Sequence, residues 1–261
     1  MKLKFPVSRF PRQFDPSVHE MMDRADVDPA LLKEDLYNIR RMNRWMGVHQ
    51  IVASELEIFF SRWSARANGS SVLPSSSIQH PASKNFAILD LCTGSGDLPR
   101  VVVDWGRRRK IKIRITSTDI NPRMLDEASL GSTDYPEIYF ERADALNPPF
   151  SDGQYDLVMC NLALHHFSAE EAVRVLKQMW RLARGAILVN DLQRSRLISF
   201  FAQTVIPLFT ANPITRFDAY VSTRRAFTDH EMLRLAFHAG IGEPQIRHYA
   251  LGRQVMTAWK G

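Results

Sequence analysis

FAILDLCTGSGDLPR, at residues 86–100, has the order of a buried β-strand, a glycine turn and the start of a helix. Two glycines let the backbone turn sharply and let a ligand approach without meeting a Cβ atom. This order predicts a nucleotide-type ligand at the carboxyl end of the first strand of a doubly wound α/β sheet. The candidate binding residues of this segment are Asp90, Gly94, Ser95, Gly96 and Asp97.

Two residues near the turn indicate which nucleotide the site suits. A dinucleotide-binding loop needs a third small residue where this chain has Pro99. Asp97 stands where a helix amino terminus would hold pyrophosphate, and its carboxylate repels phosphate. A ligand with an ammonium and a sulfonium group but no phosphate tolerates that carboxylate. We therefore predict S-adenosylmethionine as the cofactor, and we disfavour a nicotinamide-dependent oxidoreductase.

A second acidic residue follows at the expected distance. Residues 111–120 alternate apolar and polar side chains, as a strand does, and end in Asp119 and Ile120. Asp119 lies 23 residues after Gly96, close to the ~20 expected of an acid that binds ribose hydroxyls. We expect Asp119 and Ile120 to contact the cofactor. The alternative is that Asp119 caps a turn.

The segments LDLCTGSGD, STDINPRML, ERADALNPPF and YDLVMCNLALHHF resemble, in this order, the motifs of class I S-adenosylmethionine-dependent methyltransferases. Within that class the chain is similar to the ubiquinone/menaquinone-biosynthesis C-methyltransferases and other small-molecule methyltransferases. The resemblance covers residues 86–261, and residues 21–47 also resemble the leading segment of some bacterial methyltransferases found near polyketide genes. It implies a Rossmann-like seven-stranded sheet of order 3-2-1-4-5-7-6 whose last hairpin is antiparallel.

The resemblance also implies further cofactor contacts. In the resembled family an acid after the third strand binds the adenine amino group, which implies Asp144 with its neighbour Ala145. A simple turn acid is the alternative. Asn161, at the end of the fourth expected strand, completes the candidate cofactor-binding residues.

Composition and charge narrow the class of protein. The chain has 261 residues with 45% hydrophobic and 24% charged side chains, as in a globular domain with a sizeable core. Its two cysteines and the lack of a secretory-type amino terminus lead us to expect a cytoplasmic protein. The net charge of +6 raises the question of nucleic acid. However, the basic cluster at residues 107–110 suits a helix carboxyl end, so the sequence disfavours a nucleic-acid partner.

The pattern along the chain predicts two regions. Residues 1–83 are expected to form a serine-rich linker and a helical cap over the carboxyl edge of the sheet, and residues 84–261 the cofactor-binding domain. Asp28-Pro29 opens the first cap helix, and a second is expected over residues 50–63. The later strands are expected at residues 138–142, 155–160, 186–190, 245–249 and 254–259, with capping boxes at Ser168/Glu171 and Thr228/Glu231.

Residues 192–227 are too long for a plain connection after the fifth strand. They contain LISFFAQTVIPLFTA, which is shorter than the ~20 residues of a membrane-spanning helix and has a kinking proline at Pro207. We predict a lid that walls an apolar acceptor pocket. Peripheral contact with a membrane surface and plain packing against the amino-terminal helices are the alternatives. The sequence leaves the oligomeric state open.

Candidate catalytic residues follow the fourth strand. His165 or His166 is expected to act as a general base, although buried histidines are more often structural. Adjacent histidines lack the spacing of a helical metal site, so we expect no metal. The candidates for orienting the acceptor are Asp191, Arg216 and Arg224.

Together these features predict in-line methyl transfer from S-adenosylmethionine to an apolar small molecule of phenolic, quinonoid or polyketide type. Two alternatives stay open. One is an RNA methyltransferase, whose binding would weaken steeply with salt. The other is a module that binds the cofactor without catalysis.

Overall fold

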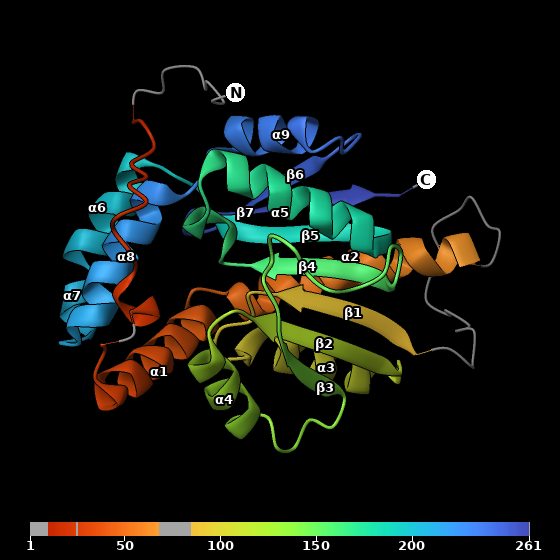
Figure 1. The fold of residues 1–261 in the computed structure, drawn as a ribbon, viewed down its shortest axis with the longest axis horizontal. Coiled ribbons are helices and arrows are strands. Elements are labelled where there is room, and N and C mark those ends of the chain that lie inside the picture. The colour runs from red at the N-terminus through yellow and green to blue at the C-terminus, as the bar shows by residue number, and fades with distance from the viewer. Residues whose placement is uncertain (1–9, 25, 68–84, 261) are drawn as a thin grey trace.

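The computed structural model describes residues 10–24, 26–67 and 85–260 and shows one twisted sheet between two layers of helices (Figure 1). The strands are β1 (Phe86–Leu91), β2 (Ile113–Asp119), β3 (Ile138–Arg142), β4 (Tyr155–Asn161), β5 (Ala183–Leu192), β6 (Gln245–Tyr249) and β7 (Arg253–Trp259). Their order in the sheet is β3-β2-β1-β4-β5-β7-β6. Neighbours among β1 to β5 pair in parallel, and β7 is antiparallel to both β5 and β6. The predicted fold class and strand order are confirmed.

Helices connect the strands and cover both faces of the sheet. Apart from short 3₁₀ turns, the described helices are α1 (Pro29–Trp45), α2 (Val48–Ala67), α3 (Asp97–Arg109), α4 (Pro122–Leu130), α5 (Ala169–Leu182), α6 (Arg196–Thr204), α7 (Ile206–Phe209), α8 (Pro213–Arg225) and α9 (Asp229–His238). Both predicted capping boxes are present, at the starts of α5 and α9. Asp28 caps α1 as predicted, accepting hydrogen bonds from the backbone of Ala30 and Leu31.

Alternate residues of each strand serve two different cores. Leu89 and Leu91 of β1 belong to the apolar cluster that includes α5 and α9. Phe86 and Ile88 of the same strand belong to the cluster that includes α2 and α3. This two-residue period is expected of strands that are buried on both faces. Because helices cover both faces, the polar groups lie at the carboxyl edge of the sheet.

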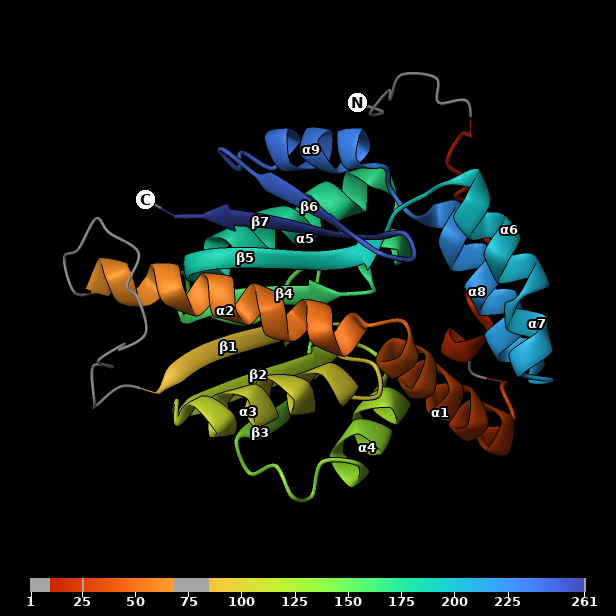
Figure 2. The same cartoon turned by 180° about the vertical axis from the view of Figure 1, so that it is seen from behind.

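The amino-terminal helices are placed differently from each other. Only α1 lies beside the carboxyl edge, where Leu32 and Leu36 pack with Met124 of α4. Helix α2 lies along α3 on one face of the sheet (Figure 2). The expectation that both helices cap the edge is therefore wrong for α2. Its buried residues, including Leu56, Phe59 and Phe60, pack with those of α3 on one face of the sheet. The helix that follows β4, α5, covers the other face. The expected serine-rich linker falls mostly on residues 68–84, outside the described residues.

The insertion after β5 forms the predicted helical lid. Helices α6, α7 and α8 pack together beyond the carboxyl edge, on the left of Figure 1. The apolar segment divides between α6 and α7 at Val205, two residues before Pro207, as the proline predicts. Among the described residues, no helix is long and apolar enough to cross a membrane.

A glycine in β5 gives a test of this packing. A Cβ atom on Gly185 would lie 2.5 Å from the backbone oxygen of Asp156 in β4, beside the point where the register shifts. We expect Gly185→Ala to lower the free energy of unfolding by about 1–3 kcal/mol, because neither strand can move away. Gly242→Ala is the control, since its Cβ would meet nothing within 4 Å. Equal denaturation midpoints for the two variants would contradict this β4–β5 packing.

Candidate functional site

A cavity of about 1200 Å³ lies at the carboxyl edge of the sheet, beneath α1 and the lid. Residues from the strand ends, the glycine turn, α1, α6 and α8 line it. Nine predicted site residues are among them: Asp90, Gly94, Ser95, Asp97, Asp119, Ile120, Asn161, His165 and His166. Topology explains this convergence, because the carboxyl ends of β1, β2 and β4 meet at one edge.

The two glycines of the turn have different roles. Gly94 has a φ of +54°, and a Cβ there would meet nothing within 4 Å, so it leaves open space beside the cavity. Gly96 has a φ of +69°, but its Cβ would lie 2.9 Å from the Cβ of Ala128 in α4. It does not line the cavity. The expectation that Gly96 makes room for a ligand is therefore wrong: it lets the turn pack against a helix.

Asp97 is held in place by the amino-terminal helices. It occupies the first turn of α3, where Asn43 Nδ2 donates to its Oδ2 at 3.0 Å and His49 Nε2 lies 3.4 Å away. Burial opposes its ionisation, but the hydrogen bonds from His49 and Asn43 outweigh burial and keep the pKa of Asp97 below its usual value. The cavity therefore contains a fixed carboxylate at the mouth of the glycine turn.

A second carboxyl group lies at the end of β1. Asp90 is buried, and Asn161 Nδ2 donates to its Oδ1 at 3.1 Å. Burial raises the pKa of Asp90 to about 7, since water cannot solvate the charged form. This group is therefore poised to ionise when a cation enters the cavity.

Asp119, at the end of β2, supports the glycine turn through hydrogen bonds. Its Oδ2 accepts from the backbone N–H of Gly94 at 2.9 Å, and its Oδ1 accepts from that of Asn121 at 3.0 Å. Burial raises its pKa despite these two hydrogen bonds. Asp119 thus caps the turn before α4, which was the alternative reading, while also lining the cavity. Ribose binding by Asp119 stays a prediction.

Several predicted residues lie outside the cavity wall. Asp144 is exposed and accepts from the backbone of Leu146, and Ala145 is buried in the core. Arg216 donates to the backbone oxygens of Thr210 and Pro207. Because these groups do not reach the cavity, adenine binding by Asp144 finds no support in the geometry.

Arg224 and Asp191 also lie outside the wall. Arg224 Nε donates to Gln13, away from the cavity. Asp191 lies behind His165, and both of its oxygens serve that histidine: Oδ2 accepts from the His165 backbone and Oδ1 lies 2.6 Å from Nδ1. Burial opposes ionisation of Asp191, but His165 outweighs it and lowers the pKa of Asp191. Asp191 therefore orients His165 and does not itself face the acceptor space.

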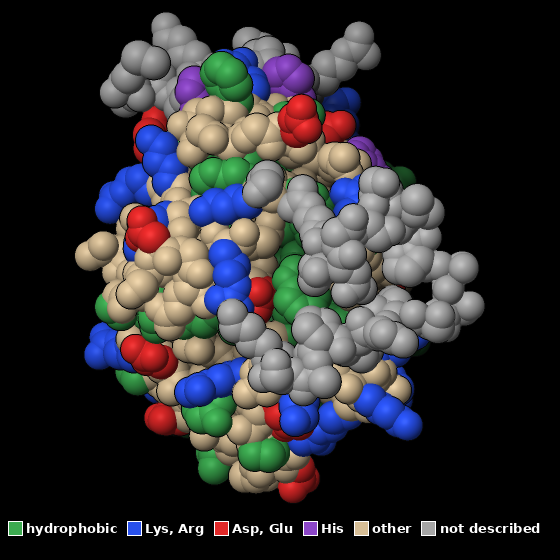
Figure 3. Space-filling view, turned by 90° about the vertical axis from the view of Figure 1, so that its right-hand side faces the viewer, with side chains coloured by type: hydrophobic (Ala, Val, Ile, Leu, Met, Phe, Trp, Pro, Cys, Tyr) green, Lys and Arg blue, Asp and Glu red, His purple; other side chains and the backbone are tan. Residues whose placement is uncertain are grey.

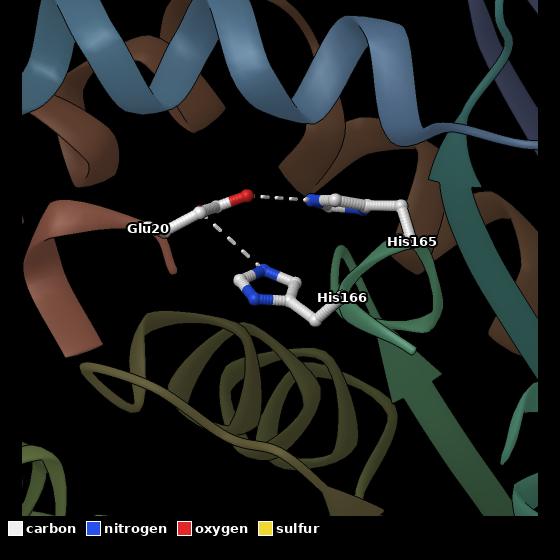
Figure 4. Close-up of side chains that lie close together, drawn as sticks. All are labelled: Glu20, His165 and His166. Atoms are coloured by element: carbon white, nitrogen blue, oxygen red, sulfur yellow. Dashed lines mark ion pairs between the residues drawn. The ribbon is translucent and has the colours of Figure 1, made fainter. Parts of the chain in front are cut away.

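The two histidines meet a glutamate that sequence analysis missed. Glu20 Oε1 lies 3.7 Å from His165 Nε2, and Glu20 Oε2 lies 3.6 Å from His166 Nε2 (Figure 4). His166 Nδ1 faces Asp23 Oδ2 at 3.5 Å. Burial by itself would lower the pKa of His166, but Glu20 and Asp23 raise it to about 10. His166 therefore carries a proton at neutral pH in this cluster, which does not suit the predicted role of general base.

Helix α8 positions Glu20. Asp218 accepts from the backbone of Met21 (2.7 Å) and of Met22 (3.0 Å), and Ser222 Oγ donates to Glu20 Oε1 at 2.8 Å. Asp218 itself is buried, which raises its pKa to about 8. No local pattern marks Glu20, because its partners lie some 145 to 200 residues further along the chain.

Part of this chain matches a family of known proteins. Residues 88–185 match the family described as "Methyltransferase domain". The chain is 33% identical to a demethylmenaquinone methyltransferase of Deinococcus radiodurans over 104 residues, 39% of this chain and 41% of that protein. It is also 33% identical to a ubiquinone/menaquinone biosynthesis C-methyltransferase of Rickettsia felis over 132 residues, 47% and 53% of the two chains. The chain thus spans about half the length of the curated relatives that it matches.

Solved structures share the fold. The magnesium protoporphyrin IX methyltransferase of Synechocystis, solved with bound SAH, has a TM-score of 0.52 at 17% identity and covers 91% of this chain and 90% of its own. The methyltransferase domain of the citrinin polyketide synthase has a TM-score of 0.54 at 12% identity, covering 68% and 47%. The predicted resemblance to class I methyltransferases and to the ubiquinone/menaquinone group is confirmed.

The raised pKa of Asp90 gives a pH-dependent prediction. An acid whose pKa is about 7 when folded and about 4 when unfolded binds more protons in the folded state between these values, so its contribution to stability falls as pH rises. We expect the melting temperature of Asp90→Asn, relative to the unchanged protein, to rise between about pH 5 and pH 8. Differential scanning calorimetry of ligand-free protein measures this difference.

Asp126→Asn is the matched control, because Asp126 is exposed on α4 and outside the cavity. Its melting temperature should keep a constant offset from the unchanged protein across the same pH range. A difference for Asp90→Asn that is flat or falls with pH would mean that Asp90 ionises normally.

Proposed function

We propose that this chain, which carries a class I methyltransferase domain over residues 88–185, transfers the methyl group of S-adenosylmethionine to an apolar small molecule. The observation that carries the proposal is the set of three carboxyl groups around an open glycine turn: Asp90 and Asp97, which are buried, and Asp119, which is half-buried. Ionised carboxyl groups in the cavity wall attract an ammonium or sulfonium group and repel a pyrophosphate.

The residues fit the cofactor in three respects. Gly94 leaves space beside the turn, where a Cβ atom would meet no neighbour. The carboxylate of Asp97 can pair with a cationic methionine end, and Asp119 has oxygens that can accept from ribose hydroxyls. When bound, S-adenosylmethionine supplies a methyl group on a sulfonium, which is reactive without further activation.

The rest of the cavity suits a second, apolar molecule. At about 1200 Å³ the cavity exceeds the ~300–1,000 Å³ of an ordinary ligand pocket, so there is room for donor and acceptor together. Its lid side is lined by apolar side chains: Leu197, Ile198, Phe200, Phe201, Val205 and Ile206. We infer that these side chains hold an acceptor of phenolic, quinonoid or polyketide type.

A buried arginine offers the acceptor a polar anchor. Arg253 lines the cavity, and its Nε has no hydrogen-bond partner among the described residues. Burial lowers the pKa of Arg253 to about 10, which still leaves it charged at neutral pH. An acidic oxygen on the acceptor would satisfy Arg253 Nε, since a buried donor without a hydrogen bond is costly.

This chain contributes mainly position and exclusion of water. The strand ends and the glycine turn hold the donor, the lid holds the acceptor, and alignment of two bound reactants can supply ~7–11 kcal/mol of the barrier. The Glu20–His165–His166 cluster faces the acceptor side of the cavity, so activation of the acceptor is best sought there.

The alternative of an RNA substrate has weaker support. On the face shown in Figure 3, at the opposite end of the molecule from the lid, Lys and Arg side chains are spread out with acidic side chains among them. Binding of RNA would show an affinity that falls steeply with salt. Methylation of small molecules in a metabolite extract, at an unchanged rate in high salt, separates the two functions.

Calorimetry of two variants tests the donor site. We expect Asp97→Asn and Asp119→Asn each to weaken S-adenosylmethionine binding about 10- to 100-fold, because each removes a charged hydrogen-bonding group. Asp126→Asn should bind like the unchanged protein. Melting temperatures of all three variants show whether any loss is a loss of folding.

Two results would count against the proposal. One is clear heat with a nicotinamide dinucleotide and none with S-adenosylmethionine. The other is donor binding without methylated product from any fraction of the extract, detected by mass spectrometry, which would favour a non-catalytic module.

A further inference from the structure

The spacing in the Glu20 cluster is wrong for hydrogen bonds. The two histidine Nε2 atoms lie 3.7 and 3.6 Å from opposite oxygens of Glu20, whereas N–H···O bonds have lengths of about 2.7–3.2 Å. Ligand atoms that share a metal ion at about 2.0–2.2 Å lie about 3–3.5 Å from each other. The three donors lie within 4.8 Å of one another, so side-chain shifts of about 1 Å would bring them to this spacing.

The surroundings of the two imidazoles match those of metal ligands. His165 Nδ1 lies 2.6 Å from Asp191, at hydrogen-bond distance, whereas His166 Nδ1 faces Asp23 at the longer distance of 3.5 Å, so a carboxylate lies behind each ring but only one is hydrogen-bonded. Metal-binding histidines almost always donate their second N–H to such a group, which fixes the tautomer and aims the other nitrogen at the ion. Here Nε2 of each ring aims at Glu20, and a metal ion that binds there would displace the proton that Glu20 and Asp23 favour on His166 (Figure 4).

Charge and access also favour a cation. Glu20 and His165 are each 3% exposed, and the buried carboxylate of Glu20 faces both imidazoles, with Asp191 and Asp23 behind them. A divalent ion stabilises a buried carboxylate by direct coordination. All three donors line the cavity, so an ion bound to them would keep coordination positions open toward the acceptor.

We propose that Glu20, His165 and His166 bind a divalent transition-metal ion at the acceptor side of the cavity. Two nitrogens and one carboxylate are the donor set of open Zn²⁺ and Fe²⁺ sites. This site replaces the predicted general base: the imidazoles are ligands and do not accept the acceptor's proton. The expectation of no metal considered only the histidine pair, since Glu20 was not visible as its partner.

The ion's role in catalysis rests on the proposed methyl transfer, whereas its binding does not. An acceptor hydroxyl that coordinates the ion has a lowered pKa. Its O–H bond breaks, the proton passes to solvent water, and the electron pair remains on the oxygen. That oxygen anion, or a carbon conjugated with it, is the nucleophile.

Metal binding is measured directly. Tag-free full-length protein is stripped with a chelator, dialysed and titrated with Zn²⁺ by calorimetry, and its metal content is read by plasma mass spectrometry. We expect about one tight equivalent per chain. Glu20→Gln and His166→Asn should each bind at least about 10-fold more weakly, while His248→Asn, an exposed histidine outside the cavity, should bind like the unchanged protein.

A second variant and an absorption spectrum distinguish loss of the metal site from misfolding of the protein. Asp23→Asn leaves the three donors intact and should weaken binding about 10- to 100-fold through lost orientation. The Co²⁺-loaded protein should show visible absorption that Glu20→Gln lacks. Equal Zn²⁺ uptake by Glu20→Gln and the unchanged protein, at equal melting temperatures, would overturn the site.

The two proposals fail separately. Metal-free protein should still bind S-adenosylmethionine by calorimetry, because Asp90, Asp97 and Asp119 are not among the metal donors. Loss of methylation on chelation, restored by Zn²⁺, Fe²⁺ or Mn²⁺, supports the catalytic role. Full activity in protein shown to be metal-free overturns that role and leaves the methyltransferase assignment standing.

Discussion

Three aspartate side chains meet at the carboxyl ends of the strands, and the charge of the cavity depends on them. Asp90 ends β1, Asp119 ends β2, and Asp97 begins α3, so parallel strands bring three acids to one cavity. The protein stabilises them unequally: Asp97 has two side-chain partners, while burial raises the pKa of Asp90. These carboxyl groups favour a cationic ligand, which is consistent with the sulfonium of the proposed donor.

The sequence predicts what local patterns encode. The alternation of strands and helices predicts an α/β sheet, and the resemblance to class I methyltransferases implies its strand order. The helix starts follow from Asp28, Ser168 and Thr228, whose side chains cap them as expected. The donor side of the cavity is predictable for the same reason. Its residues lie within one turn of a strand end, so placing the strands places them.

The remaining features of the fold and the site depend on contacts between residues that are far apart in the sequence. Helical periodicity shows that α2 has a buried side but not which surface covers it, so its packing on a sheet face could not be foreseen. Likewise, Asp191 looked like an acceptor-binding residue because it ends a strand, yet it serves His165. Glu20 lies in a segment without regular pattern, and only tertiary hydrogen bonds from α8 give it a defined place.

The hydrogen bonds from α8 connect the lid to the proposed metal site. Asp218 and Ser222 of α8 hold the turn that carries Glu20 and Asp23, while the histidines follow β4 in the rigid sheet. One side of the cluster therefore belongs to the lid and the other to the core. A movement of α8 that carried Glu20 with it would change the distance between Glu20 and the two imidazoles. The proposed metal site therefore depends on the position of the lid, because one of its three donors is held by α8.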